Sequence, residues 1–316
     1  MGIAAYFASL SIVSLVGRLP GGVAQGIIWG IMALGVFITF RVLNTSDLSV
    51  DGTFSTGGAV AVMMLLGGAP AWLAVLVATL AGIVAGLVTG ILHTRLGIPA
   101  ILAGILTQFA LYSINLHIMD GSANKAINAD KYSLLLSGRS VTGAIIVGGI
   151  FAVLICEALY WYFGTEQGSA LRATGNNPAM SRAQGINIDT MKVIGFGLAN
   201  GLVALAGALM AQYQGYADIN MGRGAIVIGL ASIIIGETVG EALLKKHFNF
   251  NARLLSIVLG GIIYYIVVIL VLWMKLPTND LKLFTAVVVA IFLAVPYIRS
   301  ASKTSFRAAA KKGEKL

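Results

Sequence analysis

The chain contains 316 residues, of which 58% are hydrophobic and only 10% are charged, and its mean hydropathy is +0.91. A soluble domain carries about 25% charged residues, so most of this chain must face lipid or other apolar helices. The net charge of +9 does not indicate a nucleic-acid partner, because six of the 21 basic residues lie in the last 18 residues. We expect this tail, 299–316, to lie against anionic lipid headgroups. The single cysteine, Cys156, excludes an intrachain disulfide.

The apolar runs predict an all-α polytopic membrane protein with about nine transmembrane helices, within a range of eight to ten. A helix needs about 20 apolar residues to cross a bilayer. No repeat or polar linker indicates a second domain, so we expect one membrane domain over 1–316. The second and seventh runs are short and bracketed by glycines or charges, which predicts tilted, broken or re-entrant helices. In chain order, the expected spans are 21–40, 52–67, 70–92, 98–118, 141–163, 191–212, 224–238, 254–274 and 281–298.

A further apolar run, 3–17, precedes the first expected span. Residues 1–19 therefore form either an extra transmembrane helix or a helix that lies in the membrane interface. We favour the interfacial helix, because Arg18-Leu19-Pro20 separates the two runs and proline disrupts a helix interior. The run has no basic start, so it does not follow the pattern of a cleaved signal peptide.

Lysines and arginines set the expected orientation, because cytoplasmic loops of membrane proteins carry more of them. Nine spans with the N-terminus outside place 14 of the 21 basic residues on the cytoplasmic side and seven on the other. We therefore expect the loops 164–190 and 239–253 and the C-terminal tail to lie in the cytoplasm.

The loop 164–190 is a polar segment between two long apolar runs. We expect a short helix that ends at Gly175, a turn at Asn176-Asn177-Pro178, and a second helix that Asn177 caps and Gly185 terminates. A rigid knob of this kind could transmit force from a soluble partner. The alternative is an ordinary basic loop on the cytoplasmic side.

Polar residues inside the expected spans cost free energy unless they face protein or water. Asp51 either caps its own helix or belongs to an irregular segment that dips into the membrane and lines a solute path. Gln108 and Asn200 lie near mid-span, where they either contact a solute or hydrogen-bond to other helices. No histidine accompanies the carboxylates, so we expect neither a metal site nor catalytic residues. The candidate solute-pathway residues are Asn44, Asp47, Asp51, Thr53, Phe54, Gln108 and Asn200.

Three segments together resemble one known family over most of residues 21–240. The loop sequence LRATGNNPAMSRAQGIN resembles the cytoplasmic loop of permease subunits of ATP-binding-cassette (ABC) importers that serve branched-chain amino acids and ribose. The next run, GFGLANGLVALAGALMAQYQG, resembles the helix that follows this loop in the family. The segment ALGVFITFRVLNTSDLSVDGTFSTGGA is similar to the N-terminal signature of a subgroup of amino-acid-type permeases.

The resemblance implies a permease subunit in the plasma (inner) membrane of a prokaryote, with its C-terminus in the cytoplasm. It implies a cytoplasmic ABC ATPase dimer that holds ATP and Mg²⁺, an extracytoplasmic solute-binding protein and a second permease copy, so we expect a homodimer. We expect no enzyme activity and no cofactor in this chain, which lacks a GxxxxGK[ST] phosphate-binding loop. The expected solute is a small or aromatic amino acid. The residues implied to couple to the ATPase are Leu171, Arg172, Ala173, Gly175, Asn177, Arg182, Gly185 and Ile186.

The main alternative is a secondary transporter driven by an ion gradient. Such proteins usually have inverted repeats and carboxylates at mid-depth, and the sequence indicates neither. A membrane-embedded enzyme is a weaker alternative, because the three histidines, His93, His117 and His247, lie in separate places and share no motif.

Overall fold

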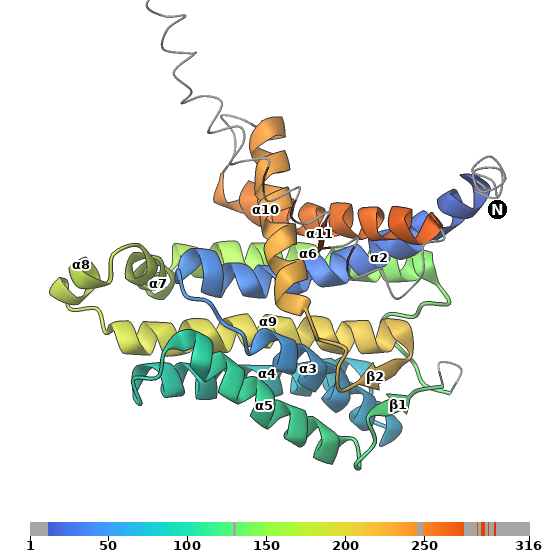
Figure 1. Ribbon diagram of the computed structural model, residues 1–316, viewed down its shortest axis with the longest axis horizontal. Coiled ribbons are helices and arrows are strands. Elements are labelled where there is room, and N and C mark those ends of the chain that lie inside the picture. The colour runs from blue at the N-terminus through green and yellow to red at the C-terminus, as the bar shows by residue number, and fades with distance from the viewer. Residues whose placement is uncertain are drawn as a thin grey trace, which may run out of the picture.

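The computed structural model describes residues 12–128, 131–244 and 249–274, together with isolated positions between 283 and 294. Most of its helices lie side by side in one elongated bundle (Figure 1). A small antiparallel sheet of two strands marks one end of the bundle, the sheet end, and helices α7 and α8 mark the other, the loop end (Figure 1). The elements are α2 (Ile12–Phe37), η1 (Ile38–Val42), α3 (Val50–Leu66), α4 (Ala71–Thr94), α5 (Ala100–Ile118), β1 (Asn124–Ala126), α6 (Val141–Gly164), α7 (Glu166–Asn176), α8 (Pro178–Ala183), α9 (Ile188–Gln214), β2 (Tyr216–Asp218), α10 (Ala225–Leu244) and α11 (Phe250–Trp273).

The structure confirms the all-α fold class. Among the described residues, seven helices are long and apolar enough to cross a membrane, and the shorter apolar helix α3 adds an eighth apolar segment. These helices correspond to the first eight spans expected from the sequence. The ninth expected span, 281–298, and the basic tail, 299–316, lie outside the continuously described residues.

The N-terminal part of the chain differs from the expectation. Pro20 lies inside α2, which continues from Ile12 to Phe37 without the break expected at Arg18-Leu19-Pro20. Membrane helices tolerate proline where the surroundings make room for the freed carbonyl group. Pro20 therefore removes one backbone hydrogen bond of α2 without ending the helix. Residues 1–11 lie outside the described part of the chain.

Glycines allow the helices around α9 to approach closely. A side chain at Gly86 of α4 would overlap the carbonyl oxygen of Phe196, and one at Gly207 of α9 would overlap that of Phe54. Small residues at such positions let helix backbones pack tightly where burial from water supplies little driving force. Helix α9 is therefore the central helix against which α2, α3 and α4 pack.

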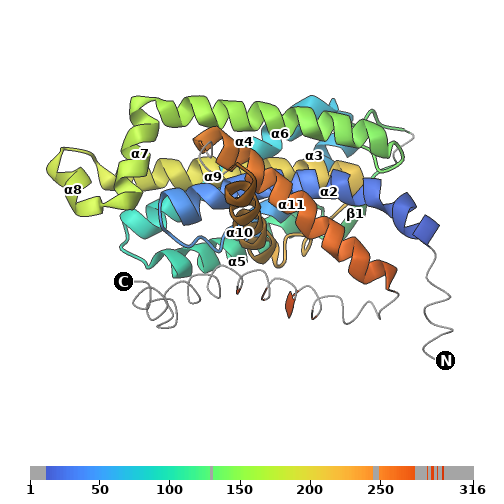
Figure 2. The same cartoon turned by 90° about the horizontal axis from the view of Figure 1, so that it is seen from above.

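Helices α3 and α10 do not run the full length of the bundle. Both begin near its middle, and α10 crosses α2 and α11 at a steep angle, so that Figure 2 shows it nearly end-on. The irregular segment 43–49 leads to α3 from the loop end, whereas 219–224 leads to α10 from the sheet end. The two segments expected to be short or broken are thus the ones whose N-termini lie inside the bundle.

Candidate functional site

A buried polar cluster links the start of α3 to the centre of α9. Asp47, only 2% exposed, accepts hydrogen bonds at Oδ1 from the Ser49 amide at 2.8 Å and the Ser49 hydroxyl at 2.6 Å. Its Oδ2 accepts one from the Asn200 side-chain amide at 2.8 Å. The Ser49 hydroxyl oxygen also lies 3.1 Å from the side-chain carbonyl oxygen of Asn200. The Asp47 carboxyl group therefore holds the start of α3 against the central helix α9.

Asp51 connects α3 to α10 rather than capping its own helix. Its Oδ2 accepts from the Gly224 amide at 2.8 Å and its Oδ1 from the Ile226 amide at 3.1 Å. These two amides belong to the start of α10, where helical N–H groups lack intrahelical partners and the helix dipole favours negative charge. The local-cap interpretation of Asp51 was therefore wrong, because the group that it caps lies 173 residues away.

Both carboxyl groups lie in the middle of the bundle. Asp47 contacts Asn200, which is close to the centre of the 27-residue helix α9, and Asp51 is at the meeting point of α3 and α10. The sequence indicated no carboxylate at such a depth, which the structure corrects. The reason is that segment 43–49 returns into the bundle before α3 begins. Irregular backbone at this depth occurs in membrane proteins where protein or a cavity surrounds it.

A hollow of about 320 Å³ lies beside this meeting point. Two of the predicted pathway residues, Asp51 and Gln108, line it. Thr53 and Phe54 are fully buried instead, and Phe54 stacks on Trp29 with ring centroids 4.7 Å apart. Asn44 lies at the surface in a left-handed conformation with φ 52°. The lining residues are Asp51, Gly52, Ser55, Gln108, Phe109, Tyr112, Asn115, Ile219, Asn220 and Arg223.

The polar loop folds as the sequence predicted. Asn177 separates α7 from α8, and its Oδ1 accepts a hydrogen bond from the Met180 amide at 3.0 Å, which is an N-cap. Pro178 occupies the first turn of α8, and Gly185 ends the unit with a φ of 83°. The first helix differs at its end, because it starts at Glu166 with Thr165 as its cap and continues through Gly175, where its end was expected, to Asn176.

The predicted coupling residues divide into a surface set and an anchoring set. Leu171 is fully buried, and Gly175 packs so closely on η1 that a side chain there would overlap the Val42 carbonyl oxygen. Ala173 and Ile186 are partly buried. Met180, 59% exposed, joins the exposed residues of the loop although the predicted set omitted it. The exposed members of the predicted set are Arg172, Asn177, Arg182 and Gly185.

A continuous series of contacts leads from α7 to the polar cluster. Gly175 lies against Val42 and Leu43, and the Leu43 side chain fills the space beside Gly195 of α9 together with that of Leu171. Leu43 ends the π-helical turn η1 and opens the irregular segment that carries Asp47. Leu43, which contacts α7, and Asp47 are four positions apart in the same irregular segment.

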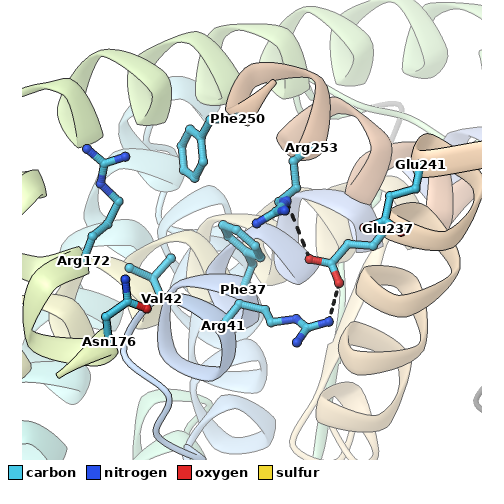
Figure 3. A pocket seen from close by; sticks show the side chains of 9 residues that line it. All are labelled: Phe37, Arg41, Val42, Arg172, Asn176, Glu237, Glu241, Phe250 and Arg253. Carbon is cyan, nitrogen blue, oxygen red and sulfur yellow. Dashed lines mark hydrogen bonds and ion pairs between the residues drawn. The ribbon is translucent and has the colours of Figure 1, made fainter. Parts of the chain in front are cut away.

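A second hollow, of about 420 Å³, lies between α7 and the loop-end parts of α10 and α11 (Figure 3). Glu237 of α10 stands between Arg41 and Arg253 and pairs with both, at 3.9 Å from Arg253 (Figure 3). On the opposite wall, Arg172 lies over the Phe250 ring at 5.8 Å from its centroid. Sequence reasoning missed this group, although a carboxylate within the short seventh run was a visible signal.

Short helices that begin inside a bundle of apolar helices, beside a polar hollow, are typical of a membrane transporter, and this is the class of protein that the fold and the site define. The profile of the family described as "Branched-chain amino acid transport system / permease component" matches residues 19–296. The chain therefore belongs to this family of permease components. No solved structure matches the chain.

Named relatives support the same assignment. The chain is 40% identical over 293 residues to the tyrosine transport system permease protein of Clostridioides difficile (strain R20291), covering 92% of this chain and 96% of the relative. It is 31% identical over 273 residues to the uncharacterized protein RP368 of Rickettsia prowazekii, covering 85% and 94%. It is 28% identical over 209 residues to the ribose import permease protein RbsC of Haemophilus influenzae, covering 65% and 64%.

Family membership confirms the predicted class. The chain is a multi-pass membrane permease component of an ABC importer, and it is a transport subunit without enzyme activity. Membership also implies that an ATPase and a solute-binding protein complete the transporter. Within the described ranges, no group of three or more His, Cys, Asp or Glu side chains could hold a metal ion.

Proposed function

We propose that this permease moves an amino acid with an aromatic side chain into the cell, driven by ATP hydrolysis on a separate ATPase dimer that docks on the α7–α8 loop. The observation that carries the proposal is the contact series from Gly175 through η1 to Asp47. The series connects the exposed helical unit α7–α8 with Asp47, which lies beside the starts of the short helices α3 and α10. The tyrosine transport relative supports the choice of solute.

The docking surface is the exposed face of the loop. Asn177, Met180 and Arg182 present an N-cap, an apolar side chain and a cation to solvent from one short helical unit. A pocket on an ATPase could bind such a unit with little loss of conformational entropy, because its shape is already fixed. This assignment places the loop end and the C-terminus in the cytoplasm. The solute-binding protein would then dock at the sheet end.

The solute path lies between two copies of the chain. Helix α5 exposes Leu106, Phe109 and Tyr112 on the face where the polar hollow lies. Polar groups such as Gln108 would be costly beside lipid, so this face needs a covering that admits water or solute. A second copy supplies such a covering. ATP binding and hydrolysis would then shift the population between two packings of the pair, which gives alternating access.

The buried carboxyl groups are the feature that would favour an ion-gradient-driven transporter. In this structure, however, every carboxyl oxygen of Asp47 and Asp51 accepts a hydrogen bond from a backbone amide or a side-chain donor. Carboxyl groups held in this way stabilise helix ends and do not need an exchanging ion. This arrangement supports a structural role for both groups and an ATP-driven mechanism.

Reconstitution tests the proposal. The permease, the ATPase and the solute-binding protein encoded beside it are placed in liposomes, and uptake of radioactive L-tyrosine is measured. We expect uptake that requires ATP and that a proton ionophore leaves unchanged. Uptake without ATP that the ionophore abolishes would favour the secondary transporter.

A matched pair of variants tests the docking surface. Met180→Glu with Arg182→Glu reverses the chemistry of the exposed face without touching a buried contact, and we expect it to abolish co-purification of the ATPase. Arg95→Glu changes a basic residue at the end of α4 at the same end of the bundle and serves as the control. Retention of the ATPase by the double variant at the control level would refute the docking assignment.

A further inference from the structure

The amide side chain of Asn115 is buried without a hydrogen-bond partner beside the polar hollow. The residue is 1% exposed, and neither Nδ2 nor Oδ1 has a partner in the part of the chain that the structure describes. Buried polar groups in folded proteins are nearly always paired, so an orphaned amide requires an explanation. Asn115 also lines the hollow that lies beside Asp51.

Two other buried amides differ from it in an informative way. Gln212 leaves Nε2 unpaired, but its Oε1 accepts from the Leu135 amide at 2.9 Å. Asn251 leaves Oδ1 unpaired, but its Nδ2 donates to Glu157 at 2.9 Å. Each of these residues thus has a structural partner at one end. Among the described residues, Asn115 is the buried amide with both ends unpaired, so no contact within the protein accounts for it.

The surroundings indicate what such an amide would bind. A primary amide offers a donor and an acceptor from one planar group. An α-amino acid presents a carboxylate that accepts and an ammonium group that donates, a short distance apart. Arg223 lines the same hollow and adds positive charge for a carboxylate, while Phe109 and Tyr112 add aromatic surface for a side chain.

We propose that Asn115 is a specificity-determining residue that binds the zwitterionic head group of the transported amino acid through both ends of its amide. This inference rests on the proposed function. In the state described here the amide is enclosed, which destabilises this state relative to one in which the amide meets the solute. The solute can shift the conformational equilibrium only through such a difference in interaction between states.

Replacement of Asn115 by leucine separates a binding role from a structural one. Asn115→Leu keeps the side-chain size and removes two unpaired polar atoms, so we expect thermal stability to rise or stay unchanged while ATP-driven L-tyrosine uptake falls at least tenfold. We expect the substitution to lower the maximal rate of uptake and to leave the KM for the solute-loaded binding protein unchanged. The reason is that the binding protein captures the solute before the solute contacts Asn115.

Gln212→Leu is the matched control. It removes the acceptor of the Leu135 amide, so we expect lower thermal stability from the same type of substitution. Asn115→Ala, which adds no bulk, repeats the uptake test should leucine disturb the packing of α5. Wild-type uptake by Asn115→Leu or Asn115→Ala would overturn the inference, as would a parallel loss of uptake and stability in both variants.

Head-group analogues test the recognised chemistry. We expect L-tyrosine to raise the thermal stability of the wild-type complex, and tyramine or 3-(4-hydroxyphenyl)propionate, each lacking one charged group, to raise it less. Equal stabilisation by either analogue would overturn recognition of both groups. Failure of the proposed function would instead appear as absent ATP-driven uptake by the unaltered complex, so the two failures are distinguishable.

Discussion

The α7–α8 loop and the mid-bundle cluster differ in the kind of contact that builds them. The loop is made by neighbours in sequence, since Asn177 caps the helix that directly follows it and Gly185 ends it. The cluster is made by residues from distant segments, since Asp47 binds Asn200 and Asp51 binds Gly224. A short-range unit can keep its shape while it moves as a body. The contacts of a long-range cluster change when the helices that carry them move, so such a cluster responds to that movement.

The largest expected effect is at the cluster. Asp47→Ala removes an acceptor that three donors share, and hydrogen bonds to charged groups contribute about 1.5–3 kcal/mol each. We therefore expect a loss of at least about 3 kcal/mol in the free energy of unfolding, with loss of uptake. Chemical denaturation in detergent measures it. Asp120→Ala at an exposed site is the control, and an equal effect there would contradict a buried structural role for Asp47.

The second-largest effect is expected where α7 contacts η1, which joins the α7–α8 loop to the cluster. Gly175→Ala places a methyl group on the Val42 carbonyl oxygen, so α7 and η1 must separate. We expect at least tenfold slower uptake although the ATPase still binds, because the exposed loop face is unchanged. Gly164→Ala, beside which there is open space, should have wild-type uptake. Normal uptake by Gly175→Ala would contradict the proposal that movement passes from the α7–α8 loop to the cluster through this contact.

A smaller effect is expected within the loop. Asn177→Ala removes an N-cap, which is worth about 1 kcal/mol. If ATPase docking needs α8 formed, retention of the ATPase on a permease column should fall roughly fivefold. Asn187→Ala removes the cap of α9 and is expected to cost similar stability without weakening retention. Equal retention by the two variants would show that the cap does not serve docking.

The smallest effect is expected at the ion-pair group of Figure 3. Glu237→Gln removes the carboxylate between Arg41 and Arg253, both of which are exposed to solvent. Exposed ion pairs contribute about 0–1 kcal/mol, and salt screens them. We expect a change in thermal stability that disappears in 0.5 M NaCl. A large, salt-independent loss would mean that Glu237 acts as a buried anchor of α10.

The sequence predicted the loop well because its signals are local. Proline after Asn177 and glycine at position 185 each limit the backbone of their own neighbours, so the turn, the cap and the helix end could be read directly. Hydropathy likewise placed eight of the nine expected spans on helices that the structure describes.

The sequence could not place the cluster, because depth in the bundle depends on the path of the chain. Asp51 lies in the first turn of its own helix, which favoured a local cap, yet its partners Gly224 and Ile226 come from a distant segment. The break expected at Pro20 was also wrong, since α2 continues through it despite the local preference of proline.

The side of the membrane on which the loop lies, and what covers it there, tests the account most directly. A cysteine introduced by Met180→Cys in a Cys156→Ser background sits at an exposed position, and its labelling by a membrane-impermeant maleimide can be measured. We predict labelling in inside-out vesicles stripped of the ATPase, protection when the ATPase is added back, and no labelling in intact cells. Labelling in intact cells, or equal labelling with and without the ATPase, would contradict the account.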